Sequence, residues 1–145
     1  MKSSVEKFLT QSEEQEIVAT IREAEKQTSG EIRVHLEATH QGELMDRAKK
    51  VFHMLKMDQT KLENGVLIYV AIEDHKFAIY GGAGIHKIVA SNFWESTKNS
   101  IQKQFKAGAF KQGLIDGITL AGSELKTYFP STRDDENELP DQISK

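Results

Sequence analysis

Alternation of apolar and polar residues predicts the first strand of this chain. Residues 31–37 read EIRVHLE, so Ile32, Val34 and Leu36 share one face and polar side chains occupy the other. Residues 66–72 form an unbroken apolar run that follows the Asn64-Gly65 turn signal. An apolar run without alternation is typical of a strand that is covered on both faces.

The second strand leads into a predicted hairpin. After a four-residue polar break at 73–76, the run 77–80 is again strand-like, which predicts a third strand near 76–81 that pairs antiparallel with the second. The run then enters Gly81-Gly82-Ala83-Gly84, after which we expect no helix to start directly. Two interpretations remain open: a simple wide turn, or a loop whose bare backbone approaches an ion or anion.

Helical spacing of apolar residues predicts four helices. A capping box at Ser12-Glu-Glu-Gln15 opens the first, which ends before Thr28-Ser-Gly30. The second spans 43–57. For the third we expect a cap at Asn92 with Glu95 reaching back. The fourth spans 110–128 and ends before Pro130.

The order of these elements predicts an α/β fold. A strand, a helix and a strand over residues 31–72 form a βαβ unit, so the first two strands should be parallel with a right-handed crossover. We therefore expect an α/β/α sandwich: a small mixed sheet, made of the parallel βαβ unit and the antiparallel hairpin, with helices on both faces. Residues 1–130 should form a single domain, followed by an acidic C-terminal tail over 131–145.

Composition excludes several functional classes. Hydrophobic content of 38% with 28% charged residues fits a soluble globular protein, and no run approaches the ~20 apolar residues of a membrane helix. The N-terminus has no apolar signal region, so we expect no membrane association and a cytoplasmic location. With no cysteine, disulfides, thiolate metal sites and a cysteine nucleophile are excluded.

Charge is concentrated at the C-terminus. Residues 131–145 carry five acidic residues against two basic ones, so the net charge of −3 belongs to the tail and the rest of the chain is about neutral. Without a basic stripe, no nucleic-acid partner is expected. The tail is either a solvated, poorly ordered terminus or a docked segment that closes a site or binds cations. Its acids are Asp134, Asp135, Glu136, Glu138 and Asp141.

Carboxylates are the candidate ligands. If the first two strands are parallel, Glu31 and Gly65 start them at one sheet edge, to which the hairpin also returns Gly82. Oxygen donors without sulfur or paired imidazoles suit Ca²⁺ or Mg²⁺. Ordinary solvated element ends are the alternative. The predicted metal ligands are Glu25, Glu31, Glu63, Asn64 and Gly82; catalytic residues are not identified.

Three segments together resemble the TPM domain, the family that includes a thylakoid lumen phosphatase-like protein. They are Thr28-Ser-Gly-Glu-Ile-Arg-Val-His35, Asn64-Gly-Val-Leu-Ile-Tyr-Val-Ala71 and Lys76-Phe-Ala-Ile-Tyr-Gly-Gly-Ala-Gly-Ile85. The match covers residues 10–130, and the closing Asn137-Glu-Leu-Pro-Asp141 is similar to a small bacterial branch without a membrane anchor, as in cold-adapted marine Bacteroidetes. Gly82 departs from that branch, where we expect an acidic residue.

The resemblance implies a divalent-cation site and, for some members, phosphatase or nucleotide-hydrolysing activity. We therefore expect a divalent cation and a phosphate-containing small molecule such as ATP or ADP as partners. The residues alone give no support to a phosphatase, because there is no Asp-x-Asp pair and no Arg-His-Gly run. One hypothesis is a metal-dependent phosphoryl hydrolase of low activity. The other is a non-catalytic cation-binding module that assists assembly or turnover of a protein complex, whose identity the sequence does not indicate.

Overall fold

A three-stranded mixed sheet forms the centre of the computed structural model, which describes residues 3–131 and 140–145. The strands are β1 (Glu31–Glu37), β2 (Gly65–Ala71) and β3 (Lys76–Gly81), in the order β1-β2-β3. β1 and β2 are parallel and β2 and β3 are antiparallel. The predicted topology, including the parallel pair, is confirmed.

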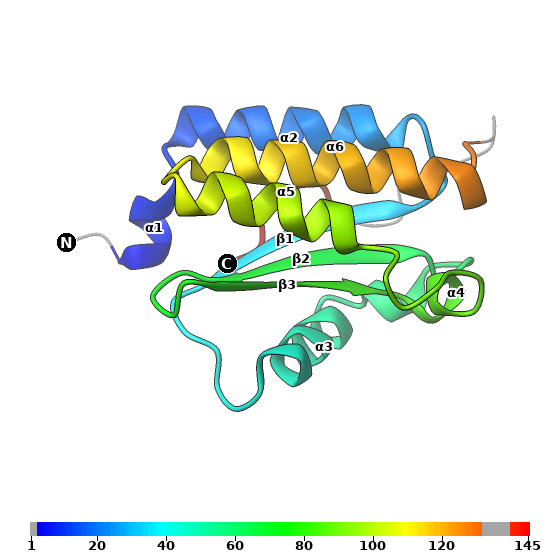
Figure 1. Ribbon diagram of the computed structural model, residues 1–145, viewed down its shortest axis with the longest axis horizontal. Coiled ribbons are helices and arrows are strands. Elements are labelled where there is room, and N and C mark those ends of the chain that lie inside the picture. Colours follow the sequence, from blue (N-terminus) through cyan, green and yellow to red (C-terminus); the bar gives the residue numbers. More distant parts are fainter. Residues whose placement is uncertain (1–2, 132–139) are drawn as a thin grey trace.

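Helices cover both faces of this sheet, as predicted for an α/β/α sandwich (Figure 1). One layer consists of three long helices, and α3 covers the opposite face, where the smaller apolar cluster lies. The layer helices are α2 (Gln11–Glu25), α5 (Glu95–Lys106) and α6 (Phe110–Tyr128); α3 spans Leu44–Met54. Three short helices were not expected: α1 (Ser4–Phe8), the 3-10 helix Met57–Gln59 and α4 (Ala83–His86). In the described part of the chain, no helix is long and apolar enough to cross a membrane.

β2 is buried along its whole length, as its unbroken apolar run predicted. Its alternate residues enter two separate apolar clusters. Val66, Ile68 and Val70 pack with the layer of α2, α5 and α6, whereas Leu67 and Tyr69 pack with α3. The sheet is therefore held by hydrophobic burial on both sides of one strand.

Two predicted helix starts are wrong. The capping box uses Thr10 and Glu13: the Glu13 amide donates to Thr10 Oγ1 at 3.1 Å, and the Thr10 amide donates to Glu13 Oε1 at 2.9 Å. α5 begins at Glu95 rather than after an Asn92 cap, and within residues 3–131 it receives no side-chain cap. Trp94 precedes it and packs edge-on against Phe93 with ring centroids 4.6 Å apart, so aromatic packing sets this entry instead of a capping hydrogen bond.

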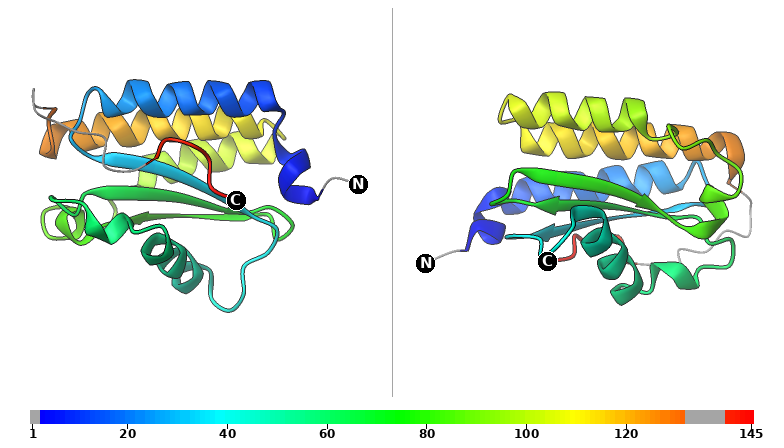
Figure 2. Two further views of the ribbon diagram at one scale, coloured as in Figure 1. Left: turned by 180° about the vertical axis from the view of Figure 1, so that it is seen from behind. Right: turned by 60° about the horizontal axis from the view of Figure 1, so that its bottom comes forward.

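The last residues of the chain run along the outer edge of β1 (Figure 2, left). The Ser144 amide donates to the Val34 carbonyl and the Leu36 amide donates to the Ser144 carbonyl, both at 2.8 Å. Residues 140–145 are therefore docked on β1, while the other tail acids lie in 132–139, outside the described residues. The polar face of β1 is also less wet than predicted, since His35 is 8% exposed and stacks on Tyr69.

Deleting residues 140–145 should expose the edge of β1. We expect hydrogen exchange at the Leu36 amide to become roughly five- to tenfold faster, because it loses a hydrogen bond worth about 1 kcal/mol. Exchange measured by NMR on the full-length and shortened chains tests this. The Ile68 amide, in the central strand, is the internal control; equal protection of Leu36 in both chains would contradict the expectation.

Candidate functional site

The strand ends meet at one edge of the sheet, as predicted. Glu31 lies opposite Gly65 in the β1–β2 register, and the Glu31 amide donates to the Asn64 carbonyl at 3.4 Å. The Gly82 amide donates to the Gly65 carbonyl at 2.9 Å, which brings the end of β3 to the same place. The backbone thus places the predicted ligands at a common edge, and the side chains decide which of them meet.

The glycine run packs against the backbone of residues 62–63. Contrary to expectation, a helix follows directly: Gly82 is the N-cap of the four-residue α4. A Cβ on Gly82 would lie 2.4 Å from the Glu63 carbonyl oxygen, and one on Gly84 would lie 2.1 Å from the Leu62 carbonyl oxygen. This conformation therefore has no room for the acidic residue expected at position 82. Close packing explains why glycine stands there instead.

The predicted ligands separate into two groups around this edge. Glu25 and Glu31 lie close enough for the charge of Glu31 to act on Glu25. Glu63 is exposed and lines a shallow depression beside His86. Asn64 is buried, and its Nδ2 donates to Ser29 Oγ at 3.3 Å. Among the described residues, no group of three or more His, Asp or Glu side chains is arranged to hold a metal ion.

A carboxyl pair fixes the C-terminal segment next to Glu31. Glu25 hydrogen-bonds Asp141, and its Oε2 accepts from the Ile32 amide at 2.8 Å. Burial, with the Asp141 hydrogen bond next in size, raises the pKa of Glu25 to about 9, so its carboxyl group holds a proton at neutral pH. Arg22 Nε lies 3.4 Å from Asp141 Oδ2. We call Glu25, Glu31 and Asp141 the edge carboxyl cluster.

A cationic hollow of about 460 Å³ adjoins this cluster. Its polar lining consists of Arg33, Lys56, Gln59 and Thr60, and Pro140, which precedes Asp141, also contributes. Arg33 follows Glu31 by two residues and so lies on the same face of β1. Within residues 3–131 and 140–145, Arg33 Nε and the Thr60 hydroxyl have no hydrogen-bond partner. We call this space the Arg33 hollow; its donors suit an oxyanion such as phosphate.

Two members of this region were missed from the sequence. Asp141 stood in the predicted tail, and its contact with Glu25 joins opposite ends of the chain. Lys56 follows α3 in the left-handed conformation, with φ of 60°, which turns the chain into the short 3-10 helix. No periodic pattern signals either placement, because both depend on where distant segments pack.

A second polar network lies on the same face of β1. His35 Nε2 is 2.9 Å from Glu37 Oε2, and Arg47 binds the other oxygen of Glu37 at 2.7 Å. His35 Nδ1 is 2.9 Å from Ser144 Oγ. Burial is the main cause that lowers the pKa of His35, outweighing the adjacent Glu37. The network joins α3, β1 and the C-terminal segment, so its role is to hold these parts together.

Comparisons with known proteins agree with this architecture. The family model described as the TPM domain matches residues 4–124. The NMR structure of the BA42 protein from the psychrophilic bacterium Bizionia argentinensis is 61% identical over 97% of each chain, with a TM-score of 0.91. The expected similarity to a cold-adapted marine Bacteroidetes protein is confirmed.

More distant structures share the fold alone. The N-terminal domain of a P. gingivalis protein is 17% identical, covers 84% of this chain and 79% of its own, and has a TM-score of 0.69. The N-terminal domain of the cg2496 protein from Corynebacterium glutamicum is 14% identical, covers 86% and 78%, and has a TM-score of 0.65. The comparison with curated protein sequences gives no match.

Glu25→Gln should make stability less dependent on pH. The pKa of Glu25 is about 9 in the folded protein against 4.5 for a free glutamate side chain, so its stabilising contribution is complete below pH 4.5 and is lost as pH rises toward 9. The slope for one proton is at most about 1.4 kcal/mol per pH unit. Denaturant unfolding in the presence of a chelator should show that the free energy of unfolding falls less between pH 5 and pH 8 for the variant than for the natural protein.

Glu23→Gln is the matched control, because Glu23 is exposed on the same helix and pairs with Lys26 at the surface. It should retain the pH dependence of the natural protein. If Glu25→Gln retained it too, the proton would not reside on the Glu25–Asp141 pair.

Proposed function

The protein belongs to the TPM domain family, and on that premise we propose that it binds Ca²⁺ or Mg²⁺ at the edge carboxyl cluster and slowly hydrolyses phosphate-containing small molecules in the Arg33 hollow. The observation that carries the proposal is the adjacency of the two: Pro140 lines the hollow while Asp141 contacts Glu25. The carboxyl groups that would bind the cation therefore lie next to the cationic side chains that would bind the phosphate group.

The donor atoms of the edge carboxyl cluster are of the kind that hard cations bind. Glu25, Glu31 and Asp141 offer carboxylate oxygens, the donors that Ca²⁺ and Mg²⁺ prefer. They are not drawn together into a complete ligand set in the described residues, and Glu25 is protonated, so binding would release its proton. When bound, the ion would neutralise phosphate charge and activate a water molecule.

The other predicted ligands are less suited to bind an ion at the edge carboxyl cluster. Glu63 faces the depression beside His86, and Asn64 is engaged with Ser29. Gly82 has no side chain, and its position against the Glu63 carbonyl leaves no space for one. We therefore assign the proposed binding chiefly to Glu25, Glu31 and Asp141, and Asn64 contributes by fixing the backbone at Glu31.

The chain's own cations would hold the substrate. Arg33 and Lys56 would bind phosphate oxygens through charge-assisted hydrogen bonds, and Thr60 would add a hydroxyl donor. Burial lowers the pKa of the Arg33 guanidinium. Preorganised charge is the main requirement of phosphoryl transfer, and the two cations among the described residues of the hollow favour slow turnover.

A non-catalytic cation-binding module is the second candidate. It is favoured by the docking of the C-terminal segment at the cluster, because an ion bound at Glu25 and Asp141 would act on the contact that holds this segment beside β1. Such a module would bind the ion, and displacement of the C-terminal segment would expose the edge of β1 to a protein partner. Ion binding without metal-dependent turnover would support this candidate.

Ca²⁺ or Mg²⁺ should first perturb the amides of the edge cluster. The Ile32 amide is the sensitive reporter, because it donates to Glu25 and would respond when that group loses its proton. Glu31→Gln should weaken binding by roughly tenfold, since it removes one anionic ligand at nearly constant shape. Asp74→Asn, at the opposite end of the sheet, is the control and should leave affinity unchanged. Shifts confined to Glu63 and its neighbours would place the ion elsewhere.

Arg33→Ala should lower phosphate release from p-nitrophenyl phosphate and ATP by at least about tenfold, because the phosphate loses a charged donor worth about 1.5–3 kcal/mol. Lys50→Ala, an exposed cation on α3, is the control and should retain the activity. Chelation should abolish turnover in the natural protein. Activity that survives both chelation and Arg33→Ala would overturn the enzymatic proposal.

A further inference from the structure

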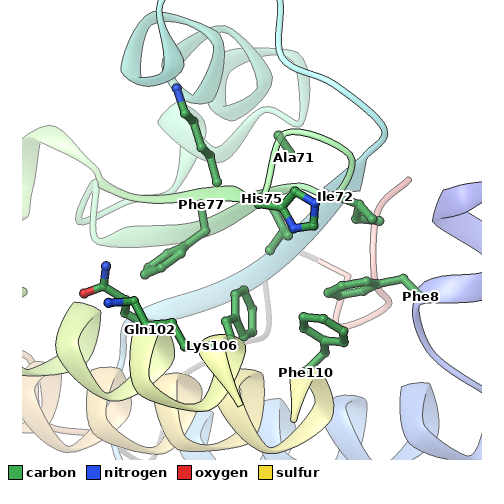
Figure 3. A pocket seen from close by; sticks show the side chains of 11 residues that line it. Phe8, Ala71, Ile72, His75, Phe77, Gln102, Lys106 and Phe110 are labelled. Atoms are coloured by element: carbon green, nitrogen blue, oxygen red, sulfur yellow. The ribbon is translucent and has the colours of Figure 1, made fainter. Parts of the chain in front are cut away.

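An apolar pocket lies at the other end of the sheet from the Arg33 hollow, where the β2–β3 hairpin turns (Figure 3). Its volume is about 420 Å³, within the range of small-molecule sites. Four phenylalanines from four different elements line it: Phe8 of α1, Phe77 of β3, Phe105 of α5 and Phe110 of α6. None of these residues belongs to the site described above.

The aromatic rings support one another around this space. Phe105 makes edge contacts with Phe8, Phe77 and Phe110, at centroid distances of 6.3, 5.5 and 5.5 Å. Phe8 lies 4.7 Å from Phe110 in a tilted contact. All four rings are only partly buried against the main core. The packing thus holds the ring positions while leaving apolar surface directed at the pocket.

The helix that carries Phe8 is tied to the hairpin. Ser4 Oγ donates to Glu73 Oε2 at 2.7 Å, and Ser3 caps α1 by accepting from the Glu6 amide at 3.2 Å. α1 is a five-residue helix with no buried residue, so it depends on such contacts to keep its place. These contacts hold the Phe8 wall in place without a ligand, so the pocket is preformed.

The polar groups of the pocket are cationic or neutral. Gln102 and Lys106 lie one turn apart on α5, and His75 lies at the hairpin turn (Figure 3). Lys76, the first residue of β3, is the second lysine of the lining. No acidic side chain is found among the described residues that line the pocket. The acids of the turn are engaged elsewhere: Glu73 with Ser4, and Asp74 with the His40 amide at 2.8 Å.

We propose that this pocket binds a small amphiphilic carboxylate. Its alkyl or aromatic body would lie between the phenylalanine rings, where burial of apolar surface drives binding. Its carboxylate would lie at the mouth, against the Lys106 ammonium and the Gln102 amide. The shape and lining of the pocket favour a ligand with an apolar body. The positive charge at its mouth favours an anionic head group over a neutral or cationic one.

Decanoate and decyltrimethylammonium below their critical micelle concentrations, and decanol below its solubility limit, test this proposal on the full chain. We expect saturable amide shifts around Ile72, Phe77 and Phe105, with decanoate binding about fivefold tighter than decanol and the cationic probe weakest. Lys106→Gln should weaken decanoate binding about fivefold and leave decanol unchanged. Lys98→Gln, an exposed cation on the same helix outside the pocket, should change neither.

Thermal unfolding of each variant checks that the fold is intact. Lys106 and Lys98 are exposed, so we expect their substitution to leave the unfolding temperature unchanged. Absence of saturable shifts with all three probes would overturn the site. Equal affinity for the anionic and cationic probes, or equal losses in Lys106→Gln and Lys98→Gln, would overturn the assignment of the head group.

Discussion

Burial of β2 on both faces is the constraint on which the rest of the structure depends. A strand that is apolar at every position needs a cover on each side, and α3 supplies one cover while α2, α5 and α6 supply the other. The crossover through α3 then makes β1 parallel to β2, so the start of β1 meets the start of β2. The edge that carries the candidate site follows from this packing.

The two ends of the sheet have opposite chemistry. At the start of β1 the chain gathers carboxyl groups and cations, with Glu25 kept protonated by burial and by Asp141. At the hairpin end it gathers phenylalanines and leaves a preformed apolar pocket. Because the same three strands separate these ends, a ligand at one has no direct contact with a ligand at the other, and the two proposals can be tested independently.

The C-terminal segment links the candidate site to the stability of the fold. Ser144 pairs with the edge of β1 and hydrogen-bonds His35, while Asp141 shares a hydrogen bond with Glu25. Contacts of this kind cover the edge of β1. An uncovered strand edge can pair with a strand of another chain, so this cover also guards against aggregation. Any ion that displaced the proton of Glu25 would act on the same contact, so ligand binding and tail docking share one carboxyl pair.

Local pattern in the sequence determined the strands, their parallel and antiparallel pairing, and the common edge of Glu31, Gly65 and Gly82, since periodicity acts within each element and each pairing joins strands that are consecutive in the chain. It did not determine the helix caps, because Ser12 and Thr10 both satisfy the capping pattern and the helix begins after Thr10. Only the tertiary structure decided which side chains meet. Asp141 contacts Glu25, Lys56 lines the same hollow as Arg33, and Phe8 lines the apolar pocket. Each of these placements brings together segments far apart in the chain, and no local pattern encodes it.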